Sequence, residues 1–531
     1  MSSSLRLCTT LGLLVGCSPW QRDADFFRSR SHSLWDAEVV SAGDAVYVRL
    51  PRAKALVRVQ PDGTIATVDL DGAAPGRMVP TPDGEALLVS TSWPFCDDPD
   101  PTIEYLADCP EEARVERTEL ALVKGTSQVD AFDVPEHLNT LSFSSDGRTA
   151  VAHLDYSRGM DIEVDGLIDL GEVMFIPLEG GEARSVSVGF SPEKVLFSAS
   201  SGGPDDKAVI FSRSEVLVVD LETLQPLVSY PLVLDSDQVV DPRDAVLTAD
   251  GRTALVAVER ASDLYELDLE TESIDLEELE SAPTAMANAI LPGVDDGADA
   301  AVTLIAYADL PRVDVLDQDT LELRAPLTLE EPVTDVLVTP TRAVLFNRWS
   351  EDFKDVYEVD LATSELTEYR VANPLDSLEL APGEAYAVGV LRPELDAGTD
   401  LDQYQDQHWG LAVIDLERQQ ETSLVLESEP LRVALLERDG EAYALVLLDD
   451  RDELLQVKLS EPTFFTQVEV AAPPLALGDL QDGRFYITHD ASLGLISFLD
   501  PTTGDLTTVG GFATPGLFPD ATLPRQPGTT R

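Results

Sequence analysis

Along most of the chain, short apolar segments alternate with polar turns at a regular spacing. The clearest turn is the segment 146–150 (Asp-Gly-Arg-Thr-Ala), which recurs unchanged at 250–254. An Asp-Gly pair between two apolar segments predicts a β-hairpin, because glycine readily adopts the positive φ that a tight turn needs. Looser copies of this first turn occur at 82–86, 382–386, 438–442 and 481–485.

A second turn motif lies between copies of the first. It consists of alternating apolar residues that end in Asp, usually Asp-Leu, followed by polar residues. In such segments the side chains alternate between the two faces of a strand, and the Asp begins a turn. Examples are 218–223, 266–271, 315–317, 358–361, 413–416 and 498–500, and Lys458 takes the same place between the last two.

Taken in chain order, the two turns alternate and define ten units of four strands. The first turns lie near 43, 83, 146, 192, 250, 296, 340, 383, 439 and 482, and the second near 60, 124, 177, 220, 268, 317, 360, 415, 458 and 500. A four-stranded unit that repeats every ~40 to 50 residues is typical of a β-propeller. The expected fold is all-β, a propeller of four-stranded antiparallel blades. Its raw count is about ten units, and a blade number from seven to ten stays open.

The repeat units also resemble a known family. The segments 143–151 and 216–223 are similar to the YVTN-type β-propeller repeats of bacterial envelope proteins. The resemblance covers about residues 37–511. It implies a propeller in the bacterial cell envelope and leaves the ligand open.

The N-terminal residues have the layout of a secretory signal. One basic residue, Arg6, precedes the apolar stretch 7–16, which is too short for a membrane helix. The stretch ends in 14–17 (Leu-Val-Gly-Cys), which resembles a bacterial lipobox. The resemblance implies cleavage before Cys17 and attachment of lipid to that cysteine. The alternative is an ordinary signal peptide with a chance cysteine.

These segments suggest four parts of the chain. We expect a lipoprotein signal peptide at 1–16, a lipid-anchored tether at 17–36, the propeller at 37–511 and a flexible tail at 512–531. The tether is polar and lacks a hydrophobic period, and the tail is rich in Pro and Gly. The expected location is the bacterial cell envelope, with the lipid anchor in the outer membrane or at the periplasmic face.

The charge balance excludes several classes of partner. The chain of 531 residues has 98 Asp and Glu against 36 Lys and Arg, which gives a formal net charge of −62. A polyanion of this size is repelled by nucleic acids and by anionic lipid headgroups. We therefore expect no nucleic-acid partner, and contact with the membrane through the lipid anchor only.

Two cysteines remain in the body of the chain. Cys96 and Cys109 are thirteen residues apart in one polar insert. In an oxidising compartment such a pair predicts a disulfide. The alternative is a metal site, although the insert contains no His and two thiols alone are a poor zinc ligand set.

Four units contain a longer interval between their two turns: 83 to 124, 146 to 177, 192 to 220 and 383 to 415. The extra residues are assigned to the connections between second and third strands, which leave a propeller on one face. Long loops on a rigid scaffold are common binding sites. These loops are acidic, and the expected binding residues are aromatic: Trp93, Tyr105, Tyr156, Tyr404 and Trp409. The alternative is that the loops are merely solvated.

One loop resembles a calcium site in its spacing. The segment 161–172 approximates the twelve-residue calcium-binding loop, with Gly166 at its sharp turn and Glu in place of Asp or Asn at the third position. The expected oxygen ligands are Asp161, Glu163, Asp165, the carbonyl of Leu167, Asp169 and Glu172. Calcium is therefore the candidate cofactor.

Signals for catalysis are weak. The five His residues form no zinc-binding pattern, and neither a nucleophile elbow nor a phosphate loop is present. No catalytic residue is therefore assigned. The favoured hypothesis is a non-enzymatic binding or scaffold protein of the envelope, whose partner is an envelope protein or another ligand. The alternative is a calcium-dependent hydrolase, similar to propeller lactonases or phytases, with its site at the ring channel.

Overall fold

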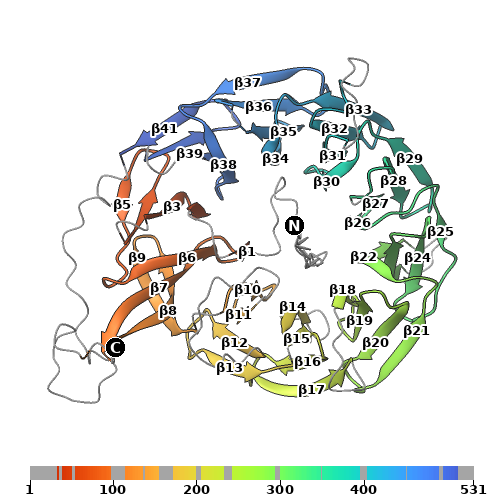
Figure 1. Cartoon of the computed structure of the whole chain (residues 1–531), viewed down its shortest axis with the longest axis horizontal. Helices are drawn as coiled ribbons and strands as arrows, with labels where there is room; N and C mark the ends of the chain where they lie inside the picture. Colours follow the sequence, from red (N-terminus) through yellow and green to blue (C-terminus); the bar gives the residue numbers. More distant parts are fainter. Residues whose placement is uncertain are drawn as a thin grey trace, which may run out of the picture.

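The structure is a computed structural model of the whole chain. It describes residues 33–34, 39–50, 54–96, 110, 114–135, 138–154, 171–189, 191–198, 205–232, 242–292, 299–348, 350–394, 404–449, 451–489 and 494–511. Within these residues every regular element is a β-strand. Ten antiparallel sheets, each with four strands in sequence and one of them with an added fifth strand, form the ten blades of a β-propeller around a central channel (Figure 1). The predicted fold class is confirmed, and the blade number is ten.

The first five blades follow one another along the chain, each built from consecutive strands. Blade 1 has β2 (Val39–Ala42), β3 (Ala45–Leu50), β4 (Ala55–Val59) and β5 (Ile65–Thr67). Blade 2 has β6 (Ala74–Pro80), β7 (Leu87–Cys96), β8 (Arg114–Lys124) and β9 (Ser127–Asp133). Blade 3 has β10 (Thr140–Phe143), β11 (Thr149–His153), β12 (Glu172–Pro177) and β13 (Arg184–Ser187). Blade 4 has β14 (Pro192–Ser198), β15 (Lys207–Ser212), β16 (Glu215–Asp220) and β17 (Gln225–Pro231). Blade 5 has β18 (Pro242–Leu247), β19 (Thr253–Val258), β20 (Asp263–Asp268) and β21 (Ile274–Glu278).

The last five blades have the same plan. Blade 6 has β22 (Pro283–Leu291), β23 (Ala300–Tyr307), β24 (Arg312–Asp317) and β25 (Leu327–Thr328). Blade 7 has β26 (Asp335–Val338), β27 (Arg342–Phe346), β28 (Asp355–Asp360) and β29 (Leu366–Arg370). Blade 8 has β30 (Leu375–Leu380), β31 (Tyr386–Leu391), β32 (Gly410–Asp415) and β33 (Gln420–Val425). Blade 9 has β34 (Pro430–Arg438), β35 (Glu441–Leu448), β36 (Glu453–Lys458) and β37 (Phe465–Glu469). Blade 10 has β38 (Pro474–Asp479), β39 (Phe485–His489), β40 (Leu495–Leu499) and β41 (Leu506–Gly510).

A short additional strand, β1 (Ser33–Leu34), precedes blade 1 in the chain but belongs to blade 3. It pairs with the inner strand β10, so that blade 3 has five strands. This strand lies within the segment expected to be a tether. In the part of the chain that the structure describes, no helix is long and apolar enough to cross a membrane.

The hydrophobic core is divided among the blade interfaces. Ten clusters of buried apolar side chains occur, and each joins two neighbouring blades. In β35, for example, Ala444, Val446 and Leu448 pack toward blade 8, whereas Leu445 and Leu447 pack toward blade 10. Strand alternation therefore supplies both clusters, which explains why middle strands of the blades, such as β35, have continuous apolar runs.

The ring closes through an apolar cluster between its last and first blades. Blade 10 and blade 1 share a cluster in which Val46 and Val57 meet Tyr486, Ile496 and Phe498. Among the described strands none is exchanged between these two blades, because each is built from consecutive strands. Figure 1 shows the last strands, in blue, beside the first blade, in red.

Aspartate side chains stabilise the turns that define the repeat. In the first turn, Asp250 Oδ1 accepts a hydrogen bond from Thr248 Oγ1 (2.7 Å) and from the backbone N–H of Arg252 (3.0 Å). Gly251 follows with a φ of 68°. In the second turn, Asp268 Oδ1 accepts the N–H groups of Glu270 and Thr271 at 2.8 and 2.7 Å. The Asp side chain of each motif thus accepts hydrogen bonds from backbone N–H groups that have no backbone acceptor in the turn.

One buried carboxyl group lies inside this framework without a hydrogen-bond partner. Glu266 in β20 is 9% exposed, and its Oε1 atom has no partner among the described residues. Burial, together with the nearby charges of Glu277 and Asp275, raises the pKa of Glu266 to about 7. Alternation along β20 places it on the same side as Leu264, which belongs to the cluster between blades 5 and 6.

We expect this group to make stability depend on pH. Because the pKa of Glu266 is higher in the folded protein than in the unfolded chain, its contribution is complete below about pH 4.5 and is lost as the pH rises through 7. Between pH 4.5 and pH 8 the unchanged protein should lose up to ~3 kcal/mol of unfolding free energy through this group. The substitution Glu266→Gln should remove that loss. Calorimetric melting temperatures at both pH values would measure this. Glu270→Gln, at an exposed site, is the control, and an equal effect of Glu266→Gln at both pH values would contradict the prediction.

Candidate binding face

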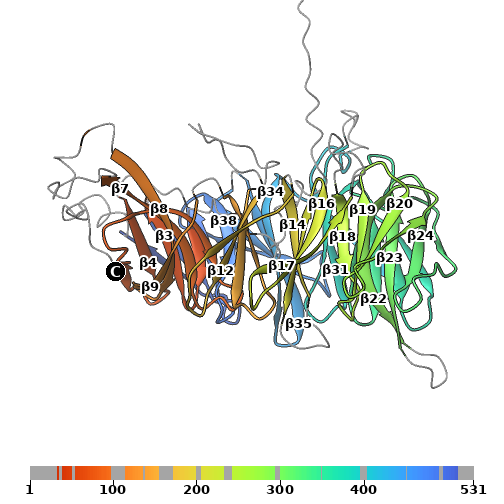
Figure 2. The same ribbon diagram turned by 90° about the horizontal axis from the view of Figure 1, so that it is seen from below.

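The strands run between two faces of the ring, which Figure 2 shows from the side. We call the end that carries the hairpins joining first to second and third to fourth strands the turn face; it includes Gly84, Gly147 and Gly251. We call the opposite end the loop face. There second strands are connected to third strands, and each blade to the next.

Three of the four long connections lie between second and third strands, as predicted. They are residues 97–113, 154–171 and 392–409, in blades 2, 3 and 8. The prediction for the fourth was wrong, because residues 199–206 join the first strand β14 to the second strand β15. Residue 192, interpreted as a turn, begins β14, and the next hairpin, at Arg213 and Ser214, lacks the Asp-Gly signal. The connection 199–206 therefore belongs to the turn face.

Trp93 also differs from its expected place. The strand β7 continues to Cys96, so Trp93 lies within the strand and is only 8% exposed. Its side chain packs with Val89 and Ala121 in the cluster between blades 1 and 2. It is therefore a core residue and does not belong to an exposed loop.

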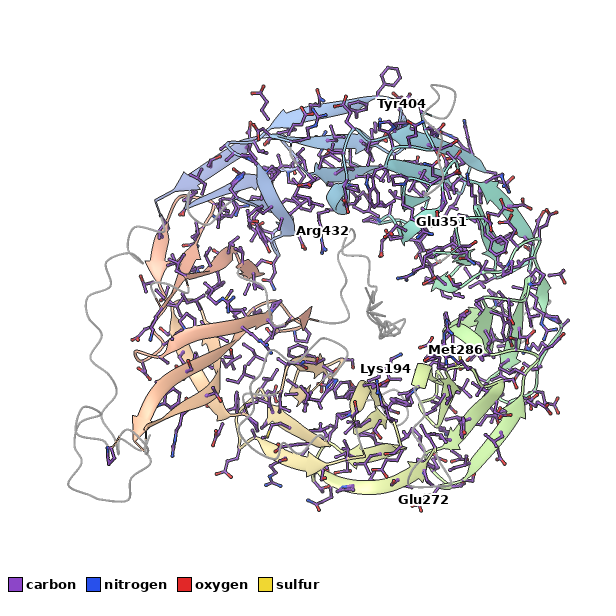
Figure 3. All side chains as sticks on the ribbon, viewed as in Figure 1. Lys194, Glu272, Met286, Glu351, Tyr404 and Arg432 are labelled. Atoms are coloured by element: carbon purple, nitrogen blue, oxygen red, sulfur yellow. The ribbon has the colours of Figure 1, made fainter. Side chains whose placement is uncertain are left out.

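Tyr404 is exposed on the loop face, as expected. Its side chain is 48% exposed, and its ring lies against that of His408 with the centroids 4.1 Å apart. His408 Nδ1 is 2.6 Å from the backbone oxygen of Tyr404. Figure 3 shows Tyr404 at the outer rim of the ring. Trp409 is only partly buried and packs against the core cluster between blades 8 and 9.

The segment that carries Tyr404 is anchored to the blade below it. Asn373, which is 1% exposed, donates hydrogen bonds from Nδ2 to the backbone oxygens of Gln405 (2.9 Å) and His408 (3.3 Å). The backbone N–H of Glu394 donates to the oxygen of Asp406 at 2.8 Å. These bonds hold both ends of the turn 404–408, so the aromatic pair is presented on an ordered backbone.

Charged residues couple this segment to blade 7. Arg392, at the end of β31, donates to the backbone oxygens of Arg348 (2.8 Å) and Ser350 (3.0 Å) and lies 3.1 Å from Glu351 Oε1. Lys354 donates to the oxygen of Ala372 at 2.9 Å and forms an ion pair with Glu394. The loop-face connections of blades 7 and 8 therefore form one platform, 347–354 with 392–394 and 404–409. The sequence motifs did not indicate these contacts.

The channel wall is also linked from blade to blade. Lys194 Nζ in β14 donates to Asp244 Oδ1 (3.1 Å) and to the backbone oxygen of Ala245 (2.8 Å). Asp244 Oδ2 accepts the backbone N–H of Met286 in β22 at 2.7 Å. Lys194 and Met286 face the channel region in Figure 3. These polar groups connect three blades, so their first role is structural.

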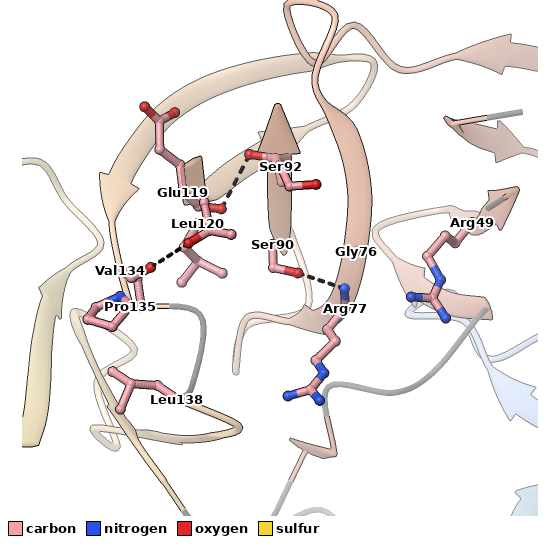
Figure 4. Close-up of a pocket in the computed structure, with 12 residues that line it drawn as sticks. Arg49, Gly76, Arg77, Ser90, Ser92, Glu119, Leu120, Val134, Pro135 and Leu138 are labelled. Carbon is pink, nitrogen blue, oxygen red and sulfur yellow. Dashed lines mark hydrogen bonds between the residues drawn. The ribbon is translucent and has the colours of Figure 1, made fainter. Parts of the chain in front are cut away.

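A pocket of about 250 Å³ opens in blade 2 (Figure 4). Its lining includes Arg49 of β3, Arg77 of β6, Ser90 and Ser92 of β7, and Glu119 of β8. The strand ends that surround it belong to the loop face. Neither arginine carried a signal in the repeat pattern.

The remaining predicted residues are mostly outside the described part of the chain. This applies to Cys17, Tyr105, Cys109, Tyr156 and five calcium ligands: Asp161, Glu163, Asp165, Leu167 and Asp169. Cys96 ends β7, but its side chain is not described. Glu172 begins β12 and accepts a hydrogen bond from Ser185 Oγ at 2.6 Å. Among the described residues no group of three or more His, Cys, Asp or Glu side chains could hold a metal ion.

Comparison with known proteins finds a likeness of fold. No family model and no curated protein matches the chain. Among solved structures, it is similar to the dihydro-heme d1 dehydrogenase NirN in complex with DHE: 18% identity, TM-score 0.36, 59% of this chain and 66% of that one. A eukaryotic initiation factor matches at 11% identity and TM-score 0.46, over 81% of this chain and 97% of its own. Saccharomyces cerevisiae Sqt1 matches at 10% identity and TM-score 0.40, over 70% and 95%. At these values the likeness concerns the propeller fold alone.

The anchoring of the aromatic pair can be tested directly. Asn373→Ala removes both bonds to the turn 404–408, so amide hydrogen exchange of residues 405–409 should become at least tenfold faster. Asn288→Ala is the matched control, because Asn288 donates to the oxygen of Leu247 in a different blade interface. Mass spectrometry of the exchanged peptides would measure the effect. Equal exchange in both variants would show that Asn373 does not hold the turn.

Proposed function

We propose that this chain is a lipid-anchored propeller of the bacterial cell envelope that binds a partner protein on its loop face. The observation that carries the proposal is the exposed Tyr404–His408 pair on a turn held by the buried Asn373. Tyrosine is enriched among residues that dominate binding energy at protein interfaces. A turn that is already ordered loses little conformational entropy on binding, which favours affinity.

The charge of the platform favours a cationic partner surface. Glu351 is partly buried beside Arg392, Asp352 is exposed, and Glu394 and Asp406 lie in the same two connections. With a net charge of −62, the whole protein attracts positive surfaces and repels negative ones. Association should therefore weaken as salt increases.

The envelope location follows from the N-terminal pattern. Leu14 to Cys17 resembles a lipobox, and a lipid on Cys17 would hold the acidic body near a membrane that repels it. An envelope protein is the expected partner, and the negative net charge disfavours nucleic acid. The calcium loop at 161–172 and the Cys96–Cys109 disulfide stay predictions.

The binding role of Tyr404 predicts a clear loss. Partner proteins captured from envelope fractions would be identified, purified and titrated against the propeller. Tyr404→Ala should raise the dissociation constant at least tenfold, which corresponds to a loss of about 1.4 kcal/mol of binding free energy. Phe464→Ala is the control, since Phe464 is 74% exposed at the turn between β36 and β37 on the turn face. Equal affinities for both variants would place the interface elsewhere.

Anchoring predicts a separate result. Replacing Cys17 by Ser removes the thiol that would receive the lipid, so the protein should move from the membrane fraction to the soluble fraction after cell lysis. Immunoblotting of the two fractions measures the change. A variant that stays with the membrane would contradict the lipoprotein assignment without bearing on the role of Tyr404.

A further inference from the structure

We propose that the pocket in blade 2 binds a small oxyanion, a carboxylate or a phosphate group, between Arg49 and Arg77. The pocket is separate from the platform that carries Tyr404, because it is formed by blades 1 and 2 and the connection into blade 3. Its two arginines come from different blades, β3 and β6, and line the same space (Figure 4).

A distortion of the inner strand creates the space. The register of β6 with β7 shifts between Pro75 and Met78, so that Gly76 and Arg77 lie opposite Ser90. Ser90 Oγ accepts the backbone N–H of Arg77 at 2.7 Å. A Cβ atom on Gly76 would lie 2.3 Å from Ser90 Oγ, so only glycine permits this close approach. The bulge thus fixes the backbone from which the Arg77 side chain extends.

Hydroxyl groups around the arginines are held in place by the blade. Thr91 Oγ1 donates to the backbone oxygen of Glu119 at 3.3 Å, and Thr118 Oγ1 donates to that of Val134 at 3.2 Å. The strands β7 and β8, with 10 and 11 residues, are the longest among the described strands. They extend the walls of the pocket toward the loop face.

The chemistry of the lining selects the ligand class. A guanidinium group carries five N–H donors and no acceptor, and it binds carboxylate or phosphate in a bidentate manner. Two such groups in one pocket are unusual in a chain with 36 basic and 98 acidic residues. The volume of about 250 Å³ lies below the ~300 Å³ of pockets for drug-sized molecules, so the ligand has few non-hydrogen atoms.

Calorimetric titration of the full chain in detergent, at constant ionic strength, tests the proposal. The probes are succinate, inorganic phosphate and the neutral analogue succinamide. We expect a dissociation constant of about 1 mM or lower for an oxyanion and no binding of succinamide. Binding of succinate alone assigns an organic acid, and binding of phosphate alone assigns a phosphate ester. No heat from either anion at about 10 mM, or equal binding of succinamide, would overturn the proposal.

Substitutions locate the site. Arg77→Gln and Arg49→Gln should each weaken anion binding at least tenfold, whereas Arg418→Gln, at an exposed position 3.5 Å from Asp415, should leave it unchanged. Ser92→Leu fills the pocket without removing either arginine and should also abolish binding. Because Ser92→Leu retains both charges, it keeps the test decisive if an arginine variant fails to fold. Unchanged binding in a folded Arg77→Gln or Ser92→Leu variant would overturn the assignment.

Discussion

The packing of one blade against the next is the interaction on which the rest of the structure depends. Each described interface contains one apolar cluster, and the same strands supply alternate residues to the clusters on either side. The closing interface between blades 10 and 1 relies on such a cluster without an exchanged strand. A weakness there would expose two blade faces at once, so burial of the large side chains of Tyr486 and Phe498 is important for closure of the ring.

The acidic composition is compatible with this ring because acidic side chains accept hydrogen bonds in the turns or are exposed to solvent. Aspartates in the turns accept backbone N–H groups, and hydrogen bonds from Thr271 lower the pKa of Asp268. Some of the scarce cations connect neighbouring blades, as in the contact of Lys194 with Asp244. Hydrogen bonds to its charged form favour the ionised carboxyl group of Asp268, so this turn of the repeat is compatible with a polyanion.

How far the sequence predicts this structure depends on the range of the interaction. The Asp turns are local, since Asp and its donors lie within three residues, and all ten second turns occur near their predicted positions. In blade 4 the predicted strand assignment is off by one strand, because the hairpin at Arg213 contains no glycine and gives no turn signal. Trp93 was misplaced because β7 is longer than its counterparts. The contacts of Asn373 with Gln405 join residues 32 positions apart, and no local pattern indicates such a pair.

Function is expected where the blades depart from their common plan, since residues required by the repeat are already committed to turns and clusters. Blade 8 departs by a long connection whose end is bound by Asn373 and whose first residue, Arg392, binds blade 7, which converts a loop into a fixed surface. Blade 2 departs by a bulge at Gly76 and by long strands, which convert an inner strand into the wall of a pocket. Both departures lie on the loop face, where second strands end, because there the chain can lengthen without disturbing the packing between blades. On the turn face the Asp-Gly hairpins, as in blades 3 and 5, are short and their hydrogen bonds fix the register, although the connection 199–206 shows that this face can also carry a longer loop.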